Sequence, residues 1–167
     1  MMRMWHFALV LVLIPAAAVA SPKKEMPAFK APPAFERLTA LIGEWQGVGE
    51  GAEQTTTSFR LTSNGSALVE ELAPTPDDPM INVYHPDGDA IVMTHYCGAG
   101  NQPRLRCETD GDRLVFTMTG ITNWKNGDTR MKGVTIAMTD ADHMSQEWIS
   151  EMGGKSETFT MEFVRKK

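Results

Sequence analysis

Alternation of apolar and polar side chains dominates the chain from Trp45 onward. Residues 134–139 read Val-Thr-Ile-Ala-Met-Thr and residues 158–163 read Thr-Phe-Thr-Met-Glu-Phe, so every second side chain is apolar. A period of two predicts strands with one face buried. Ten such strands are predicted, over residues 44–52, 55–62, 66–73, 80–85, 90–97, 104–109, 113–121, 129–139, 143–150 and 156–165.

The segments between these strands are short and carry turn residues. Pairs such as Asn64-Gly65, Asp87-Gly88, Asp110-Gly111, Asn126-Gly127 and Gly153-Gly154 favour the positive φ angles of tight hairpins. No connection is long enough for a helical crossover, so the sheet is expected to be antiparallel and up-and-down. An open sheet of ten strands would leave long unpaired edges. The pattern therefore predicts an all-β, ten-stranded barrel.

One short helix is predicted before the strands. Pro33 is placed as its first residue, Phe35, Leu38, Leu41 and Ile42 recur at helical spacing, and Gly43 ends the pattern. A single amphipathic helix of this length is suited to covering one end of a barrel.

The N-terminus has the features of a signal peptide. Arg3 precedes an apolar run over residues 8–14, and Ala18-Val-Ala20 is a small-x-small cleavage pattern. We expect cleavage after Ala20 and export to the periplasm or the medium. An uncleaved anchor is the alternative, although the run is short for a membrane span and no later stretch reaches spanning length. A Pro- and Lys-containing leader is predicted over 21–33 and one barrel domain over 34–167.

Charge and size restrict the partners. The net charge is −5, and removing residues 1–20 takes away Arg3 and moves it to −6. A polyanion such as nucleic acid, or an acidic membrane surface, is therefore not expected to bind. The remaining chain is long enough for one domain with a substantial core. Oligomeric state does not follow from the sequence.

Residues 93–107 differ from the rest of the predicted barrel wall. They read Met93-Thr-His-Tyr-Cys-Gly-Ala-Gly-Asn-Gln-Pro-Arg-Leu-Arg-Cys107. His95 is expected on the interior face with Met93, and Tyr96, Arg104 and Arg106 would gather near one loop as donors for a carboxylate or another anionic head group. The alternatives are a satisfied core histidine and arginines on a solvated outer face. Other expected interior residues, which either contact a ligand or fill the barrel, are Trp45, Trp148, Met93 and Phe116.

Cys97 and Cys107 are the only cysteines. In an exported chain a disulfide between them is the default expectation, and an antiparallel hairpin would suit it if the two face each other. A metal pair of His95 and Cys97 is the rival interpretation, which would need His85 or His143 to converge on it. No metal site is predicted.

Catalytic signals are weak. The acidic residues show no paired spacing, and no nucleophile-elbow, phosphate-loop or zinc-protease motif occurs. An enzyme with His95 as general base and Arg104 as anion stabiliser remains an alternative function.

The helix followed by Gly43-Glu-Trp45 and up-and-down strands resembles the lipocalin, or calycin, superfamily over residues 34–167. Gly43-Glu-Trp-Gln-Gly-Val-Gly49 is similar to the opening of nitrobindin-type barrels. That resemblance implies a haem with an axial histidine on the last strand. Residues 157–165 hold no histidine, and His143 lies one strand earlier.

Two further comparisons refine the resemblance. Fatty-acid-binding proteins place a helical lid between their first two strands, where this chain has only Glu53-Gln54. The segment 94–104 resembles an uncharacterised family of bacterial exported lipocalin-like proteins. The predicted function is therefore an exported barrel, without a cofactor, that holds a small apolar or amphipathic molecule. An enzyme or a haem-binding protein is the alternative.

Overall fold

The computed structural model describes residues 27–110 and 112–167. The predicted signal peptide and the first part of the leader lie outside these residues. Within the leader, the backbone oxygen of Pro27 accepts a hydrogen bond from Asn64 at 3.1 Å, and Phe29 packs edge-to-face on Phe35.

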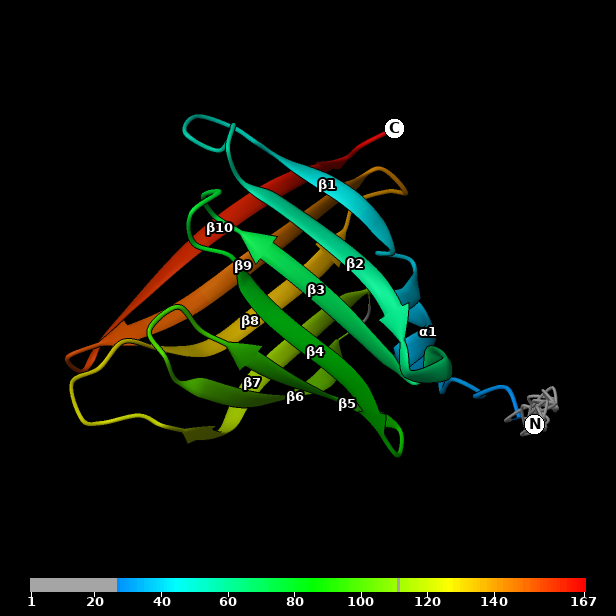
Figure 1. Cartoon of the computed structure of the whole chain (residues 1–167), viewed down its shortest axis with the longest axis horizontal. Helices are drawn as coiled ribbons and strands as arrows, with labels where there is room; N and C mark the ends of the chain where they lie inside the picture. Colours follow the sequence, from blue (N-terminus) through cyan, green and yellow to red (C-terminus); the bar gives the residue numbers. More distant parts are fainter. Residues whose placement is uncertain (1–26, 111) are drawn as a thin grey trace, which may run out of the picture.

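Ten antiparallel strands close into one barrel, as predicted (Figure 1). Each strand pairs with its neighbours in the chain, and β1 pairs with β10 to close the cylinder. Closure removes the unpaired edges that an open sheet would expose. The strands are β1 (Gly43–Val48), β2 (Thr56–Thr62), β3 (Ala67–Ala73), β4 (Met80–Asp87), β5 (Ala90–Tyr96), β6 (Gln102–Asp110), β7 (Arg113–Thr122), β8 (Arg130–Met138), β9 (His143–Met152) and β10 (Lys155–Arg165).

Most observed boundaries lie within two residues of the predicted ones, and two of the differences have local reasons. β1 ends at Val48 rather than at residue 52 because Gly49 and Gly51 adopt positive φ angles of 104° and 80° and turn the chain. β6 begins two residues early, at Gln102, and includes Pro103. Pro103 lies near the end of β6 that carries the irregularity at Arg104/Leu105, beyond the last pair of β6 with β5, Thr94 with Arg104, which is the kind of position where a strand tolerates proline.

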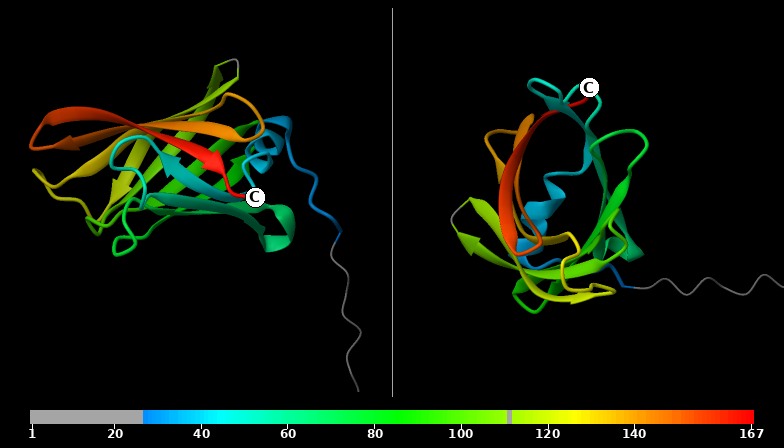
Figure 2. Two further views of the ribbon diagram at one scale, coloured as in Figure 1. Left: turned by 90° about the horizontal axis from the view of Figure 1, so that it is seen from above. Right: turned by 90° about the vertical axis from the view of Figure 1, so that its left-hand side faces the viewer.

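The helix α1 (Pro33–Thr39) covers one end of the barrel. Pro33 occupies its first turn, where a missing backbone N–H costs nothing. Phe35 and Leu38 are fully buried against the barrel core, and each contributes about 1.5–3 kcal/mol by leaving water. Ile42 lies beyond the helix and is partly exposed. Figure 2 (right) looks into the opposite end, with the helix behind the ring of strands.

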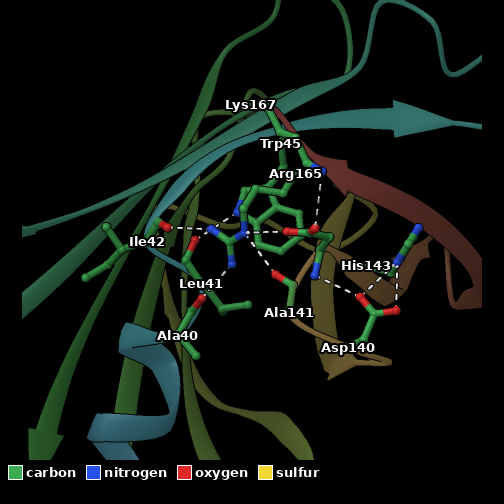
Figure 3. Close-up of polar contacts among 10 residues, drawn as sticks. Ala40, Leu41, Ile42, Trp45, Asp140, Ala141, His143, Arg165 and Lys167 are labelled. Carbon is green, nitrogen blue, oxygen red and sulfur yellow. Dashed lines mark hydrogen bonds and ion pairs between the residues drawn. The ribbon is translucent and has the colours of Figure 1, made fainter.

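Arg165 ties this closed end together (Figure 3). Its guanidinium lies 4.1 Å from the centre of the Trp45 ring and donates hydrogen bonds to the backbone oxygens of Ala40, Ile42 and Ala141 at 2.6–2.9 Å. The Trp45 indole N–H in turn donates to the oxygen of Leu41 at 2.8 Å.

This contact explains the glycine of the Gly-x-Trp motif. Gly43 has a φ of 129°, and a β-carbon there would lie 2.9 Å from the Arg165 guanidinium. The φ angle favours glycine, and a larger residue would in addition displace the Arg165 guanidinium from its contacts. The motif therefore has a structural role at the closed end of the barrel.

Candidate functional site

The inner wall of the barrel changes character along its axis. Toward α1 it is filled by large buried side chains, among them Trp45, Phe59, Leu68, Met93, Phe116 and Phe163. We call this part the helix half. Three of the predicted ligand residues, Trp45, Met93 and Phe116, lie in it and are packed as core.

Inward-facing side chains nearer the other end keep exposed surface. Phe159 is directly opposite Trp148 on β9, stacks on its ring with centroids 6.4 Å apart, and is still 47% exposed. Met161, opposite Gln146, and Met80, opposite Leu72, are partly buried against the core. Because residues directly opposite in an antiparallel pair share a face, these side chains line the interior. We call this part the loop half.

A buried carboxylate lies between the two halves. Glu70 on β3 is completely inaccessible to solvent, and its two oxygens accept four hydrogen bonds from side chains on three other strands, β2, β4 and β9. Four donor groups thus surround the two oxygens, and the contacts need no cation to complete them. The donors are Thr57 Oγ1 (3.0 Å) and Gln146 Nε2 (2.7 Å) to Oε1, and Asn82 Nδ2 (2.7 Å) and Tyr84 OH (2.5 Å) to Oε2.

The contacts continue from Glu70 to His95 and Trp148. Asn82 Oδ1 lies 2.7 Å from His95 Nδ1, and Trp148 Nε1 donates to Gln146 Oε1 at 3.0 Å. The rings of His95 and Trp148 meet edge-to-face at 5.4 Å, which closes a loop of contacts across the interior. We refer to Thr57, Glu70, Asn82, Tyr84, His95, Gln146 and Trp148 as the Glu70 network.

Burial determines the protonation state of two residues of the Glu70 network, His95 and Tyr84. Desolvation lowers the pKa of His95 from 6.5 to about 4, so the imidazole is neutral at pH 7. Burial, followed by the nearby charge of Glu70, raises the pKa of Tyr84 well above its usual value. Its hydroxyl therefore keeps the proton that it donates to Glu70.

His95 has one ring nitrogen free. Among the described side chains, Asn101 Oδ1 is the one solvent-inaccessible nitrogen or oxygen without a hydrogen-bond partner. No hydrogen-bond partner of His95 Nε2 is found among these residues, whereas Nδ1 contacts Asn82. The side chain as a whole is only 2% exposed. This nitrogen is therefore a polar atom of the inner wall with an unused hydrogen-bonding position.

The structure does not gather the predicted donors around His95. Tyr96, Arg104 and Arg106 lie on the outer face of the wall, where Tyr96 is 50% exposed and Arg106 pairs with Asp87 at 2.6 Å. Strand alternation explains this, because the side chains next to the two arginines in the chain, Leu105 and Cys107, point inward. An interior anion site that combines His95 with Arg104 is not formed.

The predicted disulfide is wrong: Cys97 and Cys107 are both free. The register pairs Cys107 with Ile91, whereas the backbone N–H of Cys97 bonds to Asn101 at the loop. The two cysteines are thus separated by six residues along the hairpin, about 20 Å at strand spacing, far beyond the reach of a disulfide. Burial raises the pKa of the Cys107 thiol to about 11, so it stays protonated.

Sequence reasoning missed Thr57, Glu70, Asn82, Tyr84 and Gln146. A signal was present. Glu70 lies between Leu68 and Leu72 in the alternation, and Gln146 lies between Met144 and Trp148. A polar residue among the apolar residues of one strand face has two explanations. Either the strand face is assigned wrongly, or the polar side chain is buried and has a hydrogen-bond partner. Two or more such positions on different strands indicate a network.

The histidine on which the haem alternative depends lies elsewhere. His143 is exposed beside Asp140 at the closed end, with its Nδ1 2.8 Å from the carboxylate (Figure 3). No group of three or more histidine, cysteine or acidic side chains within the described part of the chain is arranged to hold a metal ion.

Stability should depend on pH through His95. Its pKa is about 6.5 in the unfolded chain and about 4 in the folded protein, so between these values the unfolded chain binds more protons. Stability is therefore lost as the pH falls from 7 to 4, by about 3 kcal/mol from this residue. Urea unfolding of a His95→Gln variant should show a shallower pH dependence. The exposed His85→Gln variant is the control and should keep the parent slope.

Compared with known proteins, the chain matches no family model and no curated protein sequence. Its closed ten-stranded barrel is compatible with a calycin-like fold. No helix of the described residues is both long and apolar enough to cross a bilayer.

Proposed function

We propose that this protein is an exported carrier or sensor that binds a small amphipathic molecule in the loop half of its barrel, without a cofactor. The observation that carries the proposal is the free Nε2 of His95 among inward-facing apolar side chains that keep exposed surface. An apolar pocket with one placed polar group is the usual composition of a small-molecule site.

The apolar part of the ligand would lie against Phe159, Trp148, Met161 and Met80. Phe159 gains most from this, because an aromatic ring left half-exposed on an inner wall can bury its remaining apolar surface against a ligand. Methionine side chains adapt to ligands of different shape. The polar end would meet His95 Nε2.

Binding is favoured over catalysis by the chemistry of His95. A general base works best when its pKa is near the working pH, and burial holds the pKa of this imidazole at about 4. The arginine of the enzyme alternative, Arg104, is on the other side of the wall.

Export is supported by the pattern of residues 1–20, namely Arg3, the apolar run and Ala18-Val-Ala20. Mass determination of the protein from its own cells should give a chain that begins at Ser21. A chain that still carries residues 1–20 would contradict export with cleavage.

Native mass spectrometry of protein purified from its own cells tests the binding function. We expect a co-purifying species of small-molecule mass that is lost on denaturation. A His95→Phe variant, which removes the polar contact and keeps an aromatic ring, should show lower occupancy. Recovery of the protein without any bound species, at full folded yield, would contradict the proposal.

A further inference from the structure

The Glu70 network determines which nitrogen of His95 carries the proton. A carboxylate only accepts hydrogen bonds, so Asn82 must direct its NH2 group at Glu70. This leaves Asn82 Oδ1, an acceptor, facing His95 Nδ1 at 2.7 Å. The Nδ1 atom therefore carries the hydrogen. A neutral imidazole has only one N–H, so Nε2 presents a lone pair to the interior.

The interior holds no buried lysine or arginine within the described part of the chain. Among the described residues, Glu70 is the one buried acidic side chain, and the other buried polar residues are threonine, asparagine, glutamine and neutral histidine. An anionic head group at Nε2 would meet a lone pair rather than a donor. It would also lose its hydration with no cation to replace it, which is costly.

We propose that the barrel selects neutral molecules whose polar end is an O–H or N–H donor, and that Glu70 sets this choice by holding the His95 proton on Nδ1. The ligand class rests on the proposed binding function. The role of Glu70 does not, because the tautomer can be measured without any ligand. Glu70 is thus a positioning residue that acts through Asn82 on the atom that contacts the ligand.

The chain offers a substitution that should reverse the tautomer. In Glu70→Gln the new NH2 group must replace one carboxylate oxygen. It cannot face Gln146, because the donor-only indole of Trp148 fixes the Gln146 oxygen toward itself and its NH2 group toward residue 70. It must therefore face Asn82 and Tyr84.

Both of these neighbours can adjust. The Tyr84 hydroxyl can accept, and Asn82 can turn its amide over so that Oδ1 faces residue 70. The Asn82 NH2 group then points at His95 Nδ1, which must accept. The proton of the neutral imidazole consequently moves to Nε2, and the site presents a donor in place of an acceptor.

Nitrogen-15 NMR of histidine-labelled protein at pH 7 tests the role of Glu70. In the parent protein we expect the signals of protonated Nδ1 and unprotonated Nε2 for His95, and the reverse in Glu70→Gln. Glu71→Gln changes the neighbouring exposed carboxylate and should leave the parent pattern. A parent tautomer with the proton on Nε2, or the same tautomer in the parent and a folded Glu70→Gln, would overturn the proposal. The parent measurement stands even if the variant fails to fold.

Calorimetric titration with three matched probes tests the ligand class: 2-naphthol, 2-methoxynaphthalene and 2-naphthoate share one ring system and differ in the polar group. We expect 2-naphthol to bind about tenfold more tightly than the other two, the ratio that one well-made hydrogen bond supplies. Naphthoate binding as tightly as naphthol would refute the selectivity. If none of the three binds, the proposed binding function fails and the ligand class with it, while the NMR result still decides what Glu70 does.

Discussion

Replacing Glu70 by alanine should lower the free energy of unfolding by about 3–5 kcal/mol. The substitution removes the acceptor of four buried donors, on Thr57, Asn82, Tyr84 and Gln146, and leaves a cavity at a site with no solvent access. Each buried donor without a partner costs about 1–3 kcal/mol, and partial relaxation with entering water recovers some of it. Urea unfolding followed by tryptophan fluorescence measures the effect.

The adjacent residue provides a matched control. Glu71 is the next side chain in β3 but points outward, where it makes only a long, exposed ion pair with Arg60 at 3.5 Å. Glu71→Ala should change stability by less than about 0.5 kcal/mol. Equal losses for the two alanine variants would mean that the network does not contribute to stability as described.

Replacing Arg165 by alanine should lower the free energy of unfolding by about 2–3 kcal/mol. This side chain bonds two backbone oxygens between α1 and β1 and one in the turn between β8 and β9, and it stacks on Trp45. The substitution therefore removes contacts of β10 with the segment that joins α1 to β1 and with the β8–β9 turn. Arg165→Lys should recover little, because an ammonium group lacks the planar fork that reaches several carbonyls at once.

Arg60→Ala is the control for Arg165, since Arg60 is exposed and its one ion pair is weak. Hydrogen exchange at residues 35–45 should rise in Arg165→Ala and stay at the parent level in Arg60→Ala. An Arg165→Ala protein as stable as the parent would show that the closed end is held by α1 alone.

The barrel could be predicted from the sequence because its determinants are local. Alternation in 134–139 and 158–163 and turn pairs such as Asn64-Gly65 specify strands and hairpins without knowledge of their neighbours. Up-and-down connectivity then leaves closure as the arrangement without exposed edges. The first strand was predicted too long because Gly49 and Gly51 interrupt an otherwise strand-like run.

The site could not be predicted in the same way because it depends on contacts across the barrel. Glu70 and Gln146 are 76 residues apart in the chain and 2.7 Å apart at their bonded atoms. Alternation along the strand indicates the correct face for His95, and the side chain is buried as expected for that face. Its partners, Asn82 and Trp148, lie on an adjacent strand and on an opposite strand, and spacing in the chain does not indicate them.

The disulfide prediction is wrong for a related reason. Their spacing in the chain suits a hairpin, but the position of the turn decides which residues face each other, and here Cys97 lies at the loop while Cys107 pairs with Ile91. A shift in the turn position would change every pair, so the register has to be known first.

A crystal structure of the protein purified from its own cells, with no ligand added, would decide whether the barrel binds a small molecule as proposed. We expect electron density for a small molecule beside Trp148 and Phe159, with a donor atom within hydrogen-bond distance of His95 Nε2. A loop half closed by its own side chains, with Nε2 bonded to the protein, would contradict the proposal.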